Sequence, residues 1–409
     1  MAGTPAPAGA LPGAGHRPLR HRPAAPGGDG GRGDQRGLVV RPRKSLTHPP
    51  RKKPETTAVQ PKDTPYQSLP PRSFWRSAVA EPDPSAIADL WTPTSSLGQD
   101  EPVLTAGSCF ARHIGPALLG RGMNWRDTEP APPGLTQAER RSRQYGVFSF
   151  RTGNIYTAAT LRQWLSWAQG ESAPPDEVWC ADGGFFDPFR PSVEPEGYDS
   201  AEAMLAARRT TLDAISGALA AAGCLIFTLG LTEAWENRST GAVYPVCPGT
   251  VRGTFDPAHH VFRNFTFSEV YRDLSAALAL ARAANPALRV VLTVSPVPLT
   301  ATATGGHALT ATTYSKSVLR AVAGQLAQEH DHIDYFPAYE IITGFPFKAA
   351  FFEPNLRTVT PDGIAFAMRH FFGAVVRRPG EPRPGPGAGS HHGEDVWCDD
   401  AVLDYYNPR

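Results

Sequence analysis

The 409-residue chain lacks several features that would assign it to a familiar class. It has no uninterrupted apolar run of about 18 residues, so we expect no transmembrane helix. Its N-terminal stretch is basic but has no apolar core, so we expect no secretory signal. No repeat of about 20 to 50 residues is visible, which argues against a solenoid or a propeller.

Cysteine is scarce, and no two cysteines form a C-x-x-C pair. The five cysteines are widely spaced, at Cys109, Cys180, Cys224, Cys247 and Cys398. This pattern predicts reduced thiols in a cytoplasmic protein, with neither a disulfide framework nor a metal site.

Excess charge and a nucleotide fingerprint are also missing. The formal net charge is +1, which favours no particular partner. No G-x-G-x-x-G follows a predicted strand, so we expect no dinucleotide and no other cofactor. The hydrophobic content of 41% is sufficient for a substantial core. The oligomeric state does not follow from these features.

Composition divides the chain into three parts. Residues 1–70 are rich in Pro, Gly, Arg and Ala, a composition that predicts a disordered tail. Its basic clusters at 41–44 and 51–53 suit either contact with nucleic acid or anionic lipid, or plain solvation, so we assign no specific nucleic-acid partner. Residues 71–376 are predicted to form one domain, and residues 377–409 a Pro/Gly-rich linker and tail.

One stretch organises the predicted domain. Val103–Ala106 is a short apolar run typical of a buried strand, and Gly107 provides a turn. Apolar residues from Phe110 onward have helical spacing. Ser108 therefore lies where a strand meets a helix, at the carboxyl edge of the sheet, where ligands bind in open α/β proteins.

Further apolar runs predict more strands of the same sheet, at 224–229, 289–294 and 333–335. Helical segments alternate with these runs, which predicts a parallel sheet covered by helices on both faces. The long irregular excursion at 172–200 is predicted to cover the site, because long loops in compact domains are commonly functional.

Acyl transfer requires a nucleophile, a base and donors for the oxyanion. Ser108 is the candidate nucleophile and its own N–H one candidate donor, with Gly122 and the Gly230–Thr232 turn as others. A plain helix N-cap is the alternative for Ser108. Cys109 fits either a reactive thiol or a buried structural cysteine.

Two further side chains have open interpretations. Glu233 either positions a group in the cleft or is an exposed loop carboxylate. His113 lies on the same predicted helix as Ser108 and more commonly packs or caps than catalyses.

Several separate stretches resemble the bacterial GSCFA proteins, which are similar to the SGNH/GDSL hydrolases. They are Gly107–Ala111, Tyr145–Tyr156, Phe186–Arg190, Thr228–Trp235, Val294–Pro298 and Tyr314–Lys316. The resemblance covers about residues 70–376 and implies a three-layer α/β fold with a flavodoxin-like sheet. It also implies that Ser108 matches the catalytic serine and that Gly230 opens the third sequence block.

The chain departs from this family pattern at two places. The usual Asn of the third block is absent, leaving Thr232 or Glu233 in its place. The late Asp-x-x-His motif reads Asn355-Leu-Arg-Thr358. Asn355 cannot carry the negative charge, and Thr358 cannot accept a proton near pH 7.

The resemblance and these departures leave two functions open. The first is an SGNH-like ester hydrolase or acyltransferase acting on a small-molecule or saccharide ester, with a rearranged base or little activity. The second is a non-catalytic relative that binds a glycan or a protein partner in the cleft.

Limited proteolysis tests the predicted tail. It is expected to trim residues 1–65 and leave a compact fragment beginning near residue 66–75, because the tail cannot form a core. Mass spectrometry of the fragment locates its first residue. Protection of residues 41–53 in the free protein would contradict the prediction.

Overall fold

The computed structural model describes residues 64–376. The predicted tails at 1–63 and 377–409 lie outside the described residues. Residues 64–70, which composition assigns to the predicted tail, include a short 3-10 helix, η1 (Pro65–Ser68). The boundary at residue 71 therefore stays a prediction. Within residues 64–376, no helix is long and apolar enough to cross a bilayer.

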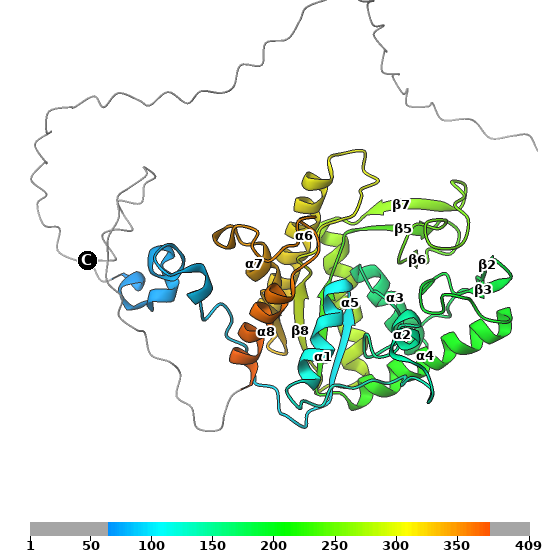
Figure 1. Ribbon diagram of the computed structural model, residues 1–409, viewed down its shortest axis with the longest axis horizontal. Helices are drawn as coiled ribbons and strands as arrows, with labels where there is room; N and C mark the ends of the chain where they lie inside the picture. Colours follow the sequence, from blue (N-terminus) through cyan, green and yellow to red (C-terminus); the bar gives the residue numbers. More distant parts are fainter. Residues whose placement is uncertain (1–63, 377–409) are drawn as a thin grey trace, which may run out of the picture. The chain divides into compact units, whose positions relative to one another are not determined.

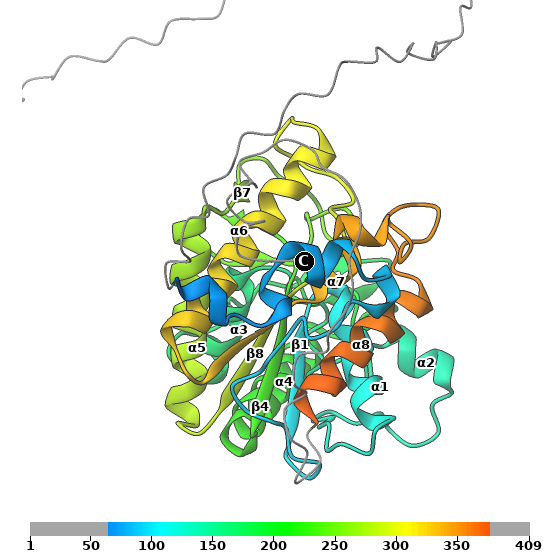
Figure 2. The same ribbon diagram turned by 90° about the vertical axis from the view of Figure 1, so that its left-hand side faces the viewer.

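Four parallel strands, among them β8 in Figure 1 and β1 and β4 in Figure 2, form the central sheet in the order β1-β4-β8-β9. They are β1 (Val103–Gly107), β4 (Cys224–Leu229), β8 (Arg289–Val294) and β9 (Ile333–Phe336). All six side chains of β4 are buried, which explains its unbroken apolar sequence. The predicted parallel pairing of these runs is confirmed, with Ala106 opposite Phe227 and Phe227 opposite Leu292.

A single parallel bridge between Val103 and Trp125 extends the sheet beyond β1. Counting the Trp125 segment as the second strand in the chain, the order across the sheet is 2-1-3-4-5. This is the flavodoxin-like order. The predicted α/β fold is therefore confirmed, and the second strand is reduced to one bridge.

Helices cover both faces of the sheet (Figure 2). Leu225 and Phe227 of β4 pack in a core cluster with α3, α4, α5 and α6, whereas Cys224 and Ile226 pack in a second cluster with α1, α7 and α8. This alternation produces three layers. The helices are α1 (Ile114–Leu119), α2 (Gln137–Ser142), α3 (Ala158–Ala168), α4 (Ala201–Ala221), α5 (Phe267–Ala284), α6 (Ala308–Glu329), α7 (Ala338–Thr343) and α8 (Pro361–Val375).

Hydroxyl side chains begin most of the long helices. Thr157, Ser200 and Thr360 each accept a hydrogen bond from a backbone N–H in the first turn of α3, α4 and α8. Thr266 and Glu269 form a reciprocal capping box at the start of α5. Such caps satisfy N–H groups that have no partner within the helix.

A second, antiparallel sheet has the order β6-β5-β7. Its strands are β5 (Glu233–Asn237), β6 (Val243–Tyr244) and β7 (His260–Asn264). This sheet has no counterpart among the strands that the sequence predicts. Every residue of β5 and β7 is half-buried, so neither strand shows the alternation or the continuous apolar run that reveals a strand in a sequence.

A buried ion-pair cluster holds the excursion at 172–200, which contains the hairpin β2 (Trp179–Ala181) and β3 (Gly184–Phe186). The Asp187 carboxylate accepts from Arg190 Nε at 2.9 Å and from both Nε and a terminal nitrogen of Arg208 on α4, at 3.0 and 2.8 Å. All three side chains are buried. Burial alone would raise the pKa of Asp187, but the two arginines outweigh it and lower this pKa.

Asp187→Asn tests this cluster. The variant leaves two buried guanidinium groups without their charge partner, so the free energy of unfolding should fall by about 3–5 kcal/mol. Urea denaturation measures the change. The exposed Asp182→Asn is the matched control and should change little. The stabilisation by Asp187 is complete above its ordinary pKa of 3.8 and should be lost as the pH falls below that value.

Candidate active site

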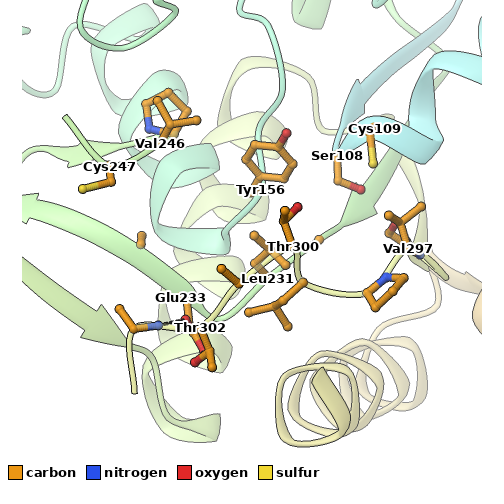
Figure 3. Close-up of a pocket in the computed structure, with 18 of the residues that line it drawn as sticks. Ser108, Cys109, Tyr156, Leu231, Glu233, Val246, Cys247, Val297, Thr300 and Thr302 are labelled. Carbon is orange, nitrogen blue, oxygen red and sulfur yellow. Dashed lines mark hydrogen bonds between the residues drawn. The ribbon is translucent and has the colours of Figure 1, made fainter. Parts of the chain in front are cut away.

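A cavity of about 360 Å³ lies at the carboxyl edge of the central sheet. Ser108 follows β1, Gly230 follows β4 and Ser295 follows β8, and all three residues line the cavity. Three strand ends thus converge on one cavity. Figure 3 shows Ser108 and Cys109 on one side of the cavity and Val246 on the other.

Glycine at position 107 allows β1 and β4 to approach closely at this edge. Gly107 has a φ of +134°, and a Cβ atom there would lie 2.7 Å from the backbone nitrogen of Thr228. The Ser108 N–H donates to the Thr228 carbonyl at 3.0 Å. The backbone therefore fixes Ser108 beside the end of β4.

The Ser108 hydroxyl is buried but has no hydrogen-bond partner among the described residues. Ser108 occupies the N-cap position of a short 3-10 helix, η5 (Cys109–His113), yet its side chain accepts no capping bond. The N-cap alternative is therefore wrong for this side chain. The predicted oxyanion role of the Ser108 N–H is also wrong, because this N–H already donates a hydrogen bond to the Thr228 carbonyl.

The Gly230–Thr232 turn is held by hydrogen bonds at each residue. The N–H groups of Gly230 and Leu231 both donate to the Tyr156 carbonyl, each at 2.9 Å. The Thr232 N–H donates to Ser315 Oγ of α6 at 3.0 Å. Because all three N–H groups are engaged, the geometry favours a positioning role for the turn over oxyanion donation.

Glu233 lines the cavity and orders its wall. Its carboxylate accepts from Thr302 Oγ1 at 2.7 Å and from the Ala303 N–H at 3.2 Å (Figure 3). The side chain is half-buried, so Glu233 is not a free loop carboxylate. Of the described residues that line the cavity, no other carries a carboxylate.

The segment matching Asp-x-x-His forms a tight turn. Asn355 Oδ1 accepts from the N–H groups of Arg357 and Thr358, and Asn355 Nδ2 donates to Thr358 Oγ1 at 2.9 Å. Asn355 and Thr358 are exposed, and neither lines the cavity. Arg357 does line it, and its buried Nε has no hydrogen-bond partner among the described residues.

Lys316 of α6 is fully buried behind the Gly230 turn. Its Nζ donates to the Gly230 carbonyl at 2.7 Å. Burial lowers the pKa of Lys316 to about 7; the neighbouring Cys109 opposes this shift, and the charge of Arg357 adds to it. In the sequence Lys316 stands out only as part of a family stretch, although its spacing to the buried Leu319 and Ala323 would have placed it on the inner face of α6.

Other groups near the cavity stay protonated or uncharged. Burial, then the neighbouring Cys109, raises the pKa of Tyr156 to about 12. Burial lowers the pKa of His113, whose ring contacts Phe110 edge-on, so the packing interpretation fits.

No histidine lines the cavity within residues 64–376. In the same range, no three His, Cys, Asp or Glu side chains form a metal-binding group.

Two predicted elements lie elsewhere. Gly122 is exposed and does not line the cavity, so it is not an oxyanion donor here. The excursion at 172–200 contributes no lining residue either. Its buried Asp187 ties it to Arg208 on α4, so the prediction that it covers the site is wrong. Residues from β5, β7 and the 295–303 loop form the walls instead.

Fold and site together define an α/β protein with a buried, unpaired serine at the carboxyl edge of a flavodoxin-like sheet. The model of the GSCFA family matches residues 102–371, more than half of the chain, and the protein belongs to this family. No curated protein matches the chain.

Among solved structures, the chain is similar to a carbohydrate esterase family 3 protein from Talaromyces cellulolyticus. The two share 12% sequence identity with a TM-score of 0.32, over 68% of this chain and 96% of that one. At this level the likeness carries no argument about function.

Gly230→Ala tests the close approach between Gly230 and Ser108. A Cβ at position 230 would lie 2.7 Å from Ser108 Cβ and 3.1 Å from the Tyr156 carbonyl oxygen. The free energy of unfolding should fall by about 1–3 kcal/mol, the usual effect of overpacking. Urea denaturation measures it.

The matched control is Gly217→Ala, at an exposed site on α4 with no atom near the added methyl group. This change should stabilise the protein by up to about 1 kcal/mol, because alanine favours helices. Equal behaviour of the two variants would contradict the close approach.

Proposed function

We propose that the protein is a serine-dependent ester hydrolase or acyltransferase with Ser108 as the nucleophile. The observation that supports this most is the state of the Ser108 hydroxyl. It is buried, it has no hydrogen-bond partner within residues 64–376, and it lies on a cavity. Buried polar groups are normally paired, and an unpaired one requires an explanation. A nucleophilic role for the Ser108 hydroxyl explains why it is unpaired, because such a hydroxyl must stay available to the substrate.

Two groups near Ser108 suit stabilisation of the developing oxyanion. The unpaired guanidinium of Arg357 faces the cavity, where it has no carboxylate partner among the described residues. The Cys109 N–H starts η5, and the first turn of a helix leaves such groups without an intrahelical acceptor. Donors of this kind are worth about 2.7–4 kcal/mol each in acyl transfer.

The cavity supports a small acylated substrate. Its volume of about 360 Å³ lies at the lower end of the range for small-molecule sites, about 300–1,000 Å³. Apolar side chains such as Val297 and Leu299 suit an acyl chain, and Glu233 offers an acceptor for alcohol hydroxyls. We therefore propose an ester of a small polyol or saccharide as the substrate class.

A fluorophosphonate probe tests the nucleophile. It should label the wild-type protein and Cys109→Ala but not Ser108→Ala, as measured by intact-protein mass spectrometry. Cys109 is the matched control because it lines the same cavity next to Ser108.

Two other results would contradict this proposal. Labelling that is lost in Cys109→Ala and kept in Ser108→Ala would indicate a thiol enzyme. A wild-type protein that resists the probe at every pH would favour the alternative, a non-catalytic protein that binds a glycan or a protein partner in this cavity.

A further inference from the structure

Lys316 is a buried amine with unusually few partners. Its side chain is 0% exposed, and its single hydrogen bond in the described structure goes to the neutral carbonyl of Gly230. No salt bridge pairs it with a carboxylate within residues 64–376. A buried ammonium with such an environment is costly, whereas a neutral amine is not. The neutral amine also retains a lone pair that no described group occupies.

Gly230 separates this amine from the Ser108 hydroxyl. The Gly230 carbonyl accepts a hydrogen bond from Lys316 Nζ at 2.7 Å. The Gly230 Cα also lies close to Ser108, because a Cβ added to it would be 2.7 Å from Ser108 Cβ. The serine hydroxyl and the lysine amine thus flank one glycine. Each has hydrogen-bonding capacity that the described residues leave unused.

We propose that Lys316 is the general base for Ser108 and replaces the histidine that the Asn355–Thr358 segment lacks. This inference rests on the proposed function, since it requires Ser108 to be the nucleophile. The two groups share no hydrogen bond in the structure, so a side-chain rotation must bring them together when substrate binds. Catalytic hydrogen bonds are often long in unliganded sites and tighten in the complex.

The surroundings of Lys316 favour the neutral form near pH 7. The titratable groups that face it are Cys109 from η5 and Arg357 from the segment before α8, with Tyr156 beside both. Burial is the main cause of the lowered pKa of Lys316, and the charge of Arg357 adds to it. The segment that carries no histidine thus supplies a cation that adds to the effect of burial.

The proposed reaction conserves atoms and charge at each step. Ser108 Oγ bonds to the ester carbonyl carbon while its proton passes to Lys316 Nζ. The resulting ammonium returns this proton to the leaving alkoxide, which departs as the alcohol and leaves an acyl-serine. Water then attacks the acyl-serine, giving its proton to the amine, and the ammonium reprotonates Ser108 as the acid leaves.

The pH dependence of the reaction gives the first test. The base must be neutral, so the second-order rate of Ser108 labelling and kcat/KM for 4-nitrophenyl acetate should rise with pH and level off above about 7. In Arg357→Gln the midpoint should move to higher pH, because a charge that disfavours the ammonium is gone. A wild-type profile that is flat from pH 5.5 to 8.5 would overturn the inference.

The Lys316→Gln variant separates a base from a positioning residue. Glutamine can still donate to the Gly230 carbonyl but cannot accept the serine proton. Its rate should fall at least about a hundredfold, within the usual range for general bases, and the rise near pH 7 should disappear. The exposed Lys348→Gln is the matched control and should behave as the wild type. A rate within about threefold of wild type in Lys316→Gln would overturn the inference.

Folding stability reports the protonation state independently of activity. The unfolded chain keeps lysine protonated up to its ordinary pKa of 10.5, whereas the folded protein releases the proton near pH 7. The unfolded state binds more protons between these values, so the stability of the wild type relative to Lys316→Met should rise from pH 7 to 10. A constant difference would show that Lys316 stays charged, and would overturn the inference.

The Ser108 and Lys316 variants together separate a failure of the proposed function from a failure of this inference. If Ser108→Ala keeps wild-type labelling, the proposed function fails as well. If Ser108 is required but Lys316→Gln is unchanged, only the role of Lys316 fails.

Discussion

The close approach of two backbones at the sheet edge is the constraint on which the site depends. Gly107 and Gly230 have no side chain where β1 and β4 end, and a Cβ at either position would lie within 2.7 Å of another residue, Thr228 or Ser108 respectively. This contact places Ser108 against the end of β4. The Gly230 carbonyl accepts a hydrogen bond from Lys316 Nζ. Gly230 therefore borders both the Ser108 side chain and the Lys316 amine.

The sequence predicts the central sheet well because burial on both faces leaves a direct signal. β4 and β8 are continuous apolar runs, and their strand ends mark the site. The antiparallel sheet carries no such signal, since β5 and β7 are half-buried throughout. Those two strands contribute residues to the cavity wall. The sequence therefore predicts the part of the site formed by the central sheet but not the part formed by β5 and β7.

The side chains of the site follow the same division. Ser108 and Gly230 could be predicted because strand ends and turn chemistry are local properties. The environments of Lys316 and Arg357 could not, because burial by distant elements determines them. Lys316 lies on α6, which faces the sheet with apolar neighbours such as Leu319 and Val322. Lys316 precedes the buried Leu319 by three residues and Ala323 by seven, so helical spacing places it on the buried face of α6. The sequence does not show how deeply distant elements bury its amine.

The turn at Asn355–Thr358 determines which charge the segment before α8 brings to the site. Asn355 Oδ1 accepts hydrogen bonds from the N–H groups of Arg357 and Thr358, and Leu356 adopts a φ of +51°. This geometry presents Arg357 to the cavity. A carboxylate close to Arg357 would offset its charge and weaken its effect on the pKa of Lys316. A neutral residue at position 355 is therefore compatible with an unpaired Arg357 and a neutral Lys316. An aspartate at position 355 would therefore weaken the contribution of Arg357 to the lowered pKa of Lys316, while the larger contribution, from burial, would remain.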